Sequence, residues 1–83
     1  RNHGLLTCAG TIADAFLFMF IMQRACEIQL KAQATGQKLI PIHSAILQGI
    51  KAQAAQVTKQ AGGSLAWPGI KRRVERRFPG FDA

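Results

Sequence analysis

Acidic residues are scarce in this sequence: four Asp and Glu stand against eleven Lys and Arg among 83 residues, for a net charge of +7. Such an excess favours an acidic partner, such as nucleic acid, anionic lipid or a phosphorylated substrate. Only 18% of the residues are charged, which is low for a small domain that must solvate a large surface. The composition therefore predicts a piece of a larger core rather than an independent domain.

Cysteine and long apolar runs are scarce too. Cys8 and Cys26 are too few, and wrongly spaced, for a disulfide framework or a cysteine-rich zinc site. We expect both to be small buried hydrophobes in a reducing, cytoplasmic compartment.

The strongest apolar run, Ala15 to Met22, spans eight residues, whereas a bilayer crossing needs roughly 20. We therefore expect no membrane partner, and a helix that is buried on nearly all sides.

One strand and one long helix are predicted near the N-terminus. Residues 4–8, "GLLTC", have strand character. Residues 12–35 follow as a helix whose apolar positions recur at helical spacing. Thr11 fits its N-cap, and Asp14 stands three residues later, where it can close a capping box.

Two further helices are predicted after a glycine cap at Gly36. They cover residues 44–60 and 68–77, with Gly62-Gly63 as the break between them and Pro68 in the first turn of the last helix. The single strand at residues 4–8 has no partner, so its N–H and C=O groups would be unpaired on both sides. We expect the rest of its sheet to lie in an N-terminal part that these residues do not include.

His3 is the sharpest candidate for chemistry. It precedes the predicted strand, and its neighbours Asn2 and Gly4 are suited to shaping a turn that a metal or substrate could approach. The residues alone leave two interpretations open, a structural histidine with satisfied hydrogen bonds or a ligand. The other histidine, His43, stands at a helix start and is interpreted as a capping or surface residue.

The basic run "KRRVERR", Lys71 to Arg77, also has two interpretations. It can be the solvated face of an amphipathic helix, with the arginine stems covering apolar surface. Alternatively, Arg72 and Arg73, with Trp67, can contact an anion or line an interface. Trp67 is otherwise a packing anchor.

Four stretches together resemble the class II aldolase/adducin family: "RNHGLLT", "TIADAF", "QRACEIQLKAQA" and the closing "WPGIKRRVERRFPGF". The resemblance covers essentially the whole chain. It implies an α/β fold, in which residues 1–83 are the C-terminal portion of one three-layer α/β/α domain whose N-terminal part is missing. These residues themselves would be mostly helical, with one strand.

The resemblance also implies a function. The histidine of the Asn-His-Gly turn, here His3, would be one of three imidazole ligands to a divalent metal, usually zinc, with Asn2 and Gly4 shaping the turn. A His-x-His pair and the acid/base carboxylate would lie upstream, so no catalytic residue is expected within these 83 and the chain alone should be inactive. The parent would be a metal-dependent lyase, performing aldol cleavage, decarboxylation or related enediolate chemistry. Its substrate would be a small hydroxy-carbonyl compound or sugar phosphate, and its assembly a homotetramer.

Two alternatives belong to other classes. An adducin-like scaffold would keep the fold without the complete metal site and act through protein contacts. A basic helical module could instead bind nucleic acid, although only Trp67 and Phe78 lie near the basic run, and such binding usually interleaves aromatic with basic residues.

Overall fold

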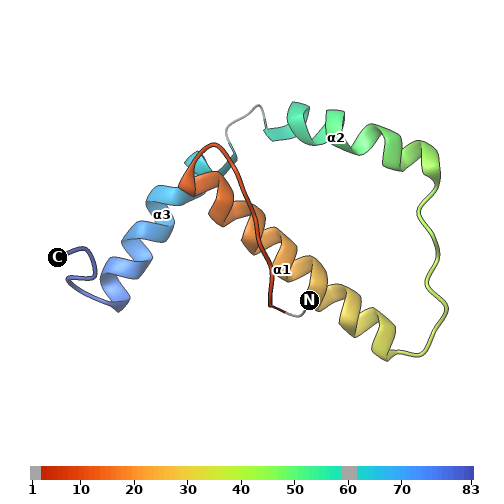
Figure 1. Ribbon diagram of the computed structural model, residues 1–83, viewed down its shortest axis with the longest axis horizontal. Coiled ribbons are helices and arrows are strands. Elements are labelled where there is room, and N and C mark those ends of the chain that lie inside the picture. The colour runs from red at the N-terminus through yellow and green to blue at the C-terminus, as the bar shows by residue number, and fades with distance from the viewer. Residues whose placement is uncertain (1–2, 59–61) are drawn as a thin grey trace.

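A computed structural model describes residues 3–58 and 62–83, and these residues contain three helices. They are α1 (Ile12–Ala34), α2 (Ser44–Thr58) and α3 (Gly62–Arg77). α1 and α3 start beside each other and then diverge, whereas α2 lies apart from that pair at the end of a long connection (Figure 1). The molecule is accordingly open, with extents of 49 × 31 × 25 Å.

α1 begins and ends as its local signals predict. The Thr11 hydroxyl accepts a hydrogen bond from the Asp14 backbone N–H at 3.1 Å, which satisfies one of the free donors of the first turn. At the other end, Gly36 has a φ of 70°, the left-handed conformation that commonly closes a helix. The predicted span of 12–35 is therefore confirmed to within one residue.

α2 confirms the interpretation of His43 as a capping residue. Its Nδ1 atom accepts a hydrogen bond from the Ala45 backbone N–H at 3.2 Å, directly at the start of the helix. The side chain is exposed and has a structural role. α2 is described as far as Thr58, and residues 59 and 60 of the predicted span lie outside the described residues.

The prediction for the start of α3 was wrong. This helix begins at Gly62 rather than near Pro68, so Gly63 is helical and Pro68 lies inside the helix. The cause is a tertiary contact: Gly63 is buried against α1, where an added Cβ would overlap the Ala13 carbonyl. The Asp14 carboxylate also accepts a hydrogen bond from the Gly63 N–H at 2.8 Å. These contacts overcome the low intrinsic helix propensity of glycine.

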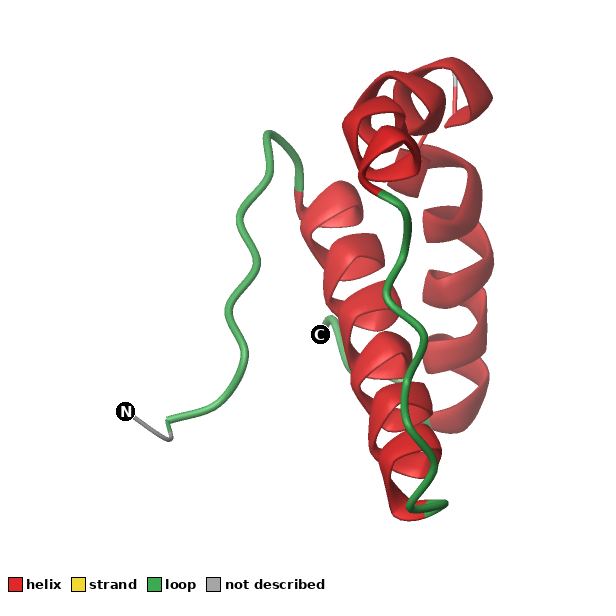
Figure 2. Ribbon diagram, turned by 90° about the vertical axis from the view of Figure 1, so that its right-hand side faces the viewer, coloured by secondary structure: helices red, strands yellow, loops and turns green. Residues whose placement is uncertain are grey.

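The strand predicted at residues 4–8 is not formed, and residues 3–58 and 62–83 contain no strand at all (Figure 2). The segment is instead an irregular extended stretch, joined to α1 by a hydrogen bond from the Thr7 hydroxyl to the Ala15 carbonyl at 2.9 Å. A strand needs a neighbour to pair its backbone groups, and this segment has none within the described chain. The three-layer arrangement is accordingly not seen in these residues.

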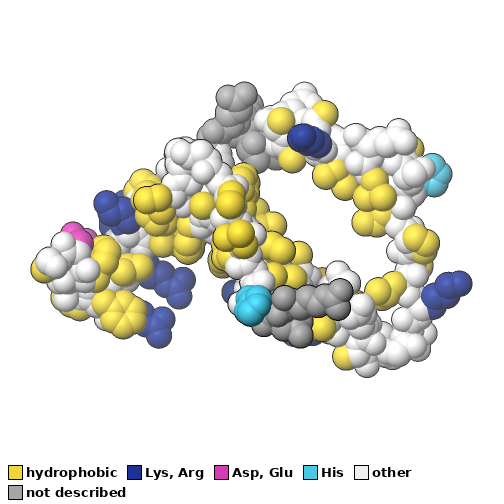
Figure 3. Space-filling model, in the orientation of Figure 1, with side chains coloured by type: hydrophobic (Ala, Val, Ile, Leu, Met, Phe, Trp, Pro, Cys, Tyr) yellow, Lys and Arg dark blue, Asp and Glu magenta, His cyan; other side chains and the backbone are white. Residues whose placement is uncertain are grey.

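No hydrophobic side chain in the described part of the chain is fully buried. The run expected to be buried on nearly all sides is open instead, with Phe18 48% and Ile21 55% exposed. Hydrophobic side chains reach the surface along α1 and α2 (Figure 3). Cys8 is exposed and Cys26 half-buried, so the expectation of two buried cysteines is also wrong for this chain. The apolar faces therefore lack the cover that a closed core would provide.

None of the helices that the structure describes combines the length and the apolar character that crossing a bilayer requires.

We expect these 83 residues alone to melt over a broad temperature range. Without a closed core, few long-range contacts support all-or-none unfolding, although the caps favour helix. Far-ultraviolet circular dichroism should show helix with a gradual thermal decline. A sharp, concentration-independent two-state transition of a monomer would contradict this expectation.

Replacing Gly63 with Ala should open the junction between α1 and α3. The new methyl group would overlap backbone atoms of α1, which cannot move aside as a flexible side chain can, and such overpacking costs about 1–3 kcal/mol. The nuclear Overhauser contacts between the Phe16 and Trp67 rings should then weaken. Gly69→Ala is the matched control, since its Cβ would meet only the end of the Arg72 side chain at 3.8 Å. Equal effects of both substitutions would contradict the proposed close approach.

Candidate functional site

The His3 imidazole is exposed and has no hydrogen-bond partner within the described residues. Gly4 follows with a φ of 120°, a conformation that side-chain-bearing residues rarely adopt, and open space surrounds the position of its absent Cβ. The backbone therefore turns immediately after His3 and leaves the ring accessible. Asn2, the other residue predicted to shape this turn, lies outside the described residues.

His3 does not form a metal site with other residues of this chain. Across residues 3–58 and 62–83, no group of three or more His, Cys, Asp or Glu side chains is placed to hold an ion. A catalytic zinc site needs three protein ligands and one open position. The described residues thus supply at most one ligand, and any complete site requires donors from elsewhere.

Trp67 lies at the packing contact between α1 and α3. Its ring is half-buried, with a centroid 5.6 Å from that of Phe16 and a tilt of 57° between the planes. The Phe16 ring also stacks near Phe20, at 6.5 Å. This arrangement agrees with the interpretation of Trp67 as a packing anchor. Phe16 is 37% exposed.

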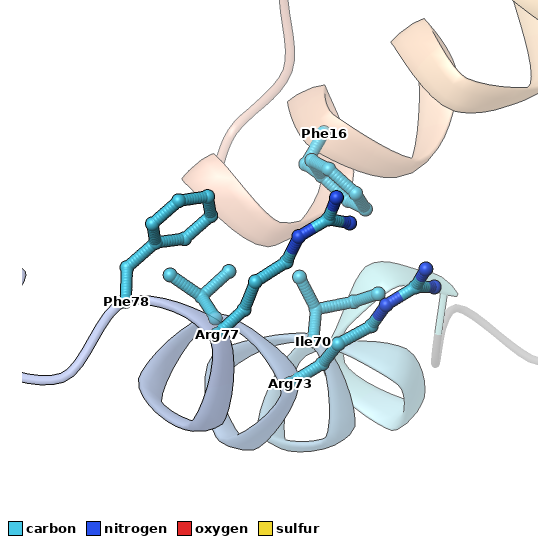
Figure 4. A pocket seen from close by; sticks show the side chains of 6 residues that line it. Phe16, Ile70, Arg73, Arg77 and Phe78 are labelled. Atoms are coloured by element: carbon cyan, nitrogen blue, oxygen red, sulfur yellow. The ribbon is translucent and has the colours of Figure 1, made fainter.

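A pocket of about 250 Å³ opens beside this aromatic contact, between the start of α1 and the last turns of α3 (Figure 4). Its lining residues are Phe16, Ile70, Arg73, Val74, Arg77 and Phe78. The four-residue spacing of Ile70, Val74 and Phe78 predicts one apolar face along α3 and the residue just after it, and all three line the pocket together with Phe16 of α1. That Phe16 would line this pocket could not be predicted from the sequence, because its place there depends on how α3 meets α1.

Only some arginines of the basic run, Lys71 to Arg77, line this pocket. Arg73 lines the pocket, whereas Arg72, the other arginine predicted to reach an anion, is not among the lining residues. The sequence analysis did not single out Arg77, which lines the pocket and lies with its guanidinium carbon 5.8 Å from the centroid of the Phe78 ring. The spacing of four residues between Arg73 and Arg77 is the signal that could have identified the pair.

The ion pair that the structure does contain lies elsewhere, on α1. Arg24 contacts Glu27 at 3.0 Å, and its guanidinium carbon lies 5.4 Å from the centroid of the Phe20 ring. Both partners are well exposed, so the pair contributes little stability. Within the described chain, neither arginine of the pocket is part of an ion pair.

The N-terminal part of the chain matches a known protein family. Residues 1–30 match the family described as "Class II Aldolase and Adducin N-terminal domain". This match includes His3, Gly4 and the first half of α1.

Three relatives illustrate the range of similar proteins. A "putative aldolase class 2 protein" of Pseudomonas aeruginosa is 49% identical over 83 positions, covering 96% of this chain and 32% of the relative. One of the same description from Caulobacter vibrioides is 37% identical over 87 positions, covering 98% of this chain and 32% of the relative. Human gamma-adducin is 35% identical over 65 positions, covering 78% of this chain and 9% of the relative.

This chain thus spans about a third of the length of the bacterial relatives, 32% of each. No solved structure gives a significant match.

Proposed function

The chain belongs to the class II aldolase and adducin family, and from this membership we propose that it contributes one metal ligand, His3, to a metal-dependent lyase. The observation that carries the proposal is the family match over residues 1–30, which contains the Asn-His-Gly turn. The accessible imidazole of His3 and the glycine-specific backbone beside it support the same role.

In the proposed role, the His3 imidazole binds the metal ion through a ring nitrogen. His3 would donate a ring-nitrogen lone pair, while the remaining ligands and the acid/base group come from residues outside these 83. A divalent ion held in this way, zinc in the usual case, would supply polarisation of a substrate carbonyl and stabilisation of negative charge on its oxygen. Aldol cleavage or decarboxylation of a small hydroxy-carbonyl compound would use that stabilisation.

A scaffold without catalysis is the second candidate, and one observation favours it. Gamma-adducin matches 78% of this chain at 35% identity, so similarity of this degree extends beyond the proteins described as aldolases. In a scaffold the open apolar faces of the helices would serve protein contacts, and His3 would bind no metal. The two candidates therefore differ in metal content.

His3→Ala should remove most of the bound metal and the lyase activity from the intact protein, because a three-ligand site would lose one imidazole. His43→Ala is the matched control: it also removes an exposed histidine, but one that caps α2. Elemental analysis of both purified variants measures the difference. Full metal occupancy in His3→Ala would exclude the ligand role, and a metal-free unmodified protein that does not take up added zinc would favour the scaffold.

Gly4→Ala should weaken metal binding by about tenfold through strain in the turn. A φ of 120° is unfavourable for alanine, and such backbone strain costs about 1–3 kcal/mol. Gly10→Ala is the control, since Gly10 also lies in open space but lacks a positive φ. Competition with a metal-binding dye measures the affinity, and an unchanged affinity in Gly4→Ala would show that the turn does not position His3.

A further inference from the structure

The pocket between α1 and α3 joins apolar walls with cationic groups. Phe16 projects from α1 toward α3, and Arg73 and Arg77 extend from α3 on the side that faces α1 (Figure 4). Ile70, Val74 and Phe78 complete the walls. No acidic residue lines the pocket, so its lining carries two positive charges and no negative charge.

Arg73 and Arg77 are one helical turn apart, and like charges at this spacing repel each other. Neither forms an ion pair within the described chain. The guanidinium of Arg77 lies against the Phe78 ring, and this contact holds it at the edge of the pocket. An anion bound between the two arginines would relieve the repulsion and accept charge-assisted hydrogen bonds from both.

The apolar walls restrict which anions would fit. Phe78 is 59% exposed and Phe16 37% exposed, so both rings still have surface that a ligand could cover. The volume of about 250 Å³ lies below the roughly 300–1,000 Å³ of pockets for drug-sized ligands. A single aromatic ring or a short branched chain matches a site of this size.

We propose that this pocket binds a small organic anion, a carboxylate attached to one aromatic ring or branched aliphatic chain. The carboxylate contacts Arg73 and Arg77, and the apolar body lies against Phe16, Ile70 and Val74. The site is separate from the proposed metal site, because it includes neither His3 nor Gly4. It therefore does not depend on the lyase activity.

Three probes test the proposal on the intact, unmodified protein: phenylacetate, its uncharged analogue phenylacetamide, and acetate. Methyl resonances of Ile70 and Val74 report binding at this pocket. Phenylacetate should shift both saturably and bind at least about tenfold more tightly than either other probe, because it alone combines charge with a ring. Equal binding of phenylacetamide would mean that the arginines are not used. Equal binding of acetate would mean that the walls are not used, and no saturable shift would overturn the site.

Two charge-matched double variants separate a local site from the general attraction of a basic protein. Arg73→Gln with Arg77→Gln should weaken phenylacetate binding at least about tenfold, since it removes both pocket cations. Arg72→Gln with Arg76→Gln removes the same charge from arginines that do not line the pocket and should change the affinity less than about twofold. An equal loss in both would show that only net charge attracts the anion, and the proposed site would be wrong.

Discussion

The packing of α3 against α1 depends on the hydrogen bonds that the Asp14 carboxylate accepts. One oxygen accepts a hydrogen bond from the Thr11 hydroxyl at the start of α1. The other accepts a hydrogen bond from the Gly63 N–H at the start of α3. A negative charge at two helix N-termini also complements both helix dipoles. Because Gly63 lacks a Cβ, α3 can approach the α1 backbone closely enough to form this bond. The Phe16–Trp67 contact and the neighbouring pocket both follow from that approach.

Much apolar surface remains open because the described helices pack mainly where α1 meets α3. α1 meets α3 near their starts, while side chains farther along α1, such as Phe18 and Ile21, remain about half exposed. Buried apolar area is the main source of folding free energy, so the contact between α1 and α3 provides limited stability. The bacterial relatives are about three times longer, since the chain covers 32% of each. The scarcity of charged residues, 18% of the sequence, agrees with this open apolar surface.

The sequence pointed to His3 more directly than to the pocket between α1 and α3. His3 could be singled out because its Asn-His-Gly motif resembles one of the class II aldolase/adducin family, whereas the residues alone also allowed a structural histidine. The positive φ of Gly4 is compatible with a turn at this motif. The proposed anion pocket was anticipated in part, through Arg73 and through the spacing that places Ile70 and Val74 on one face of α3. The pocket combines Phe16 of α1 with residues of α3 and with Phe78 just after it, and Phe16 and Ile70 are about fifty positions apart in the sequence. No local pattern records which face of one helix meets the other.

The sequence by itself determined the ends of α1 and the start of α2. Thr11, Gly36 and His43 act through bonds or backbone angles within a few residues, so these signals work without distant contacts. Only the tertiary structure decided where α3 begins and whether residues 4–8 form a strand. Gly62-Gly63 becomes helical because Asp14, 49 positions away from Gly63, supplies its hydrogen-bond acceptor. A strand, by contrast, requires a neighbouring strand, and because none of the described residues forms one, the backbone of residues 4–8 is irregular.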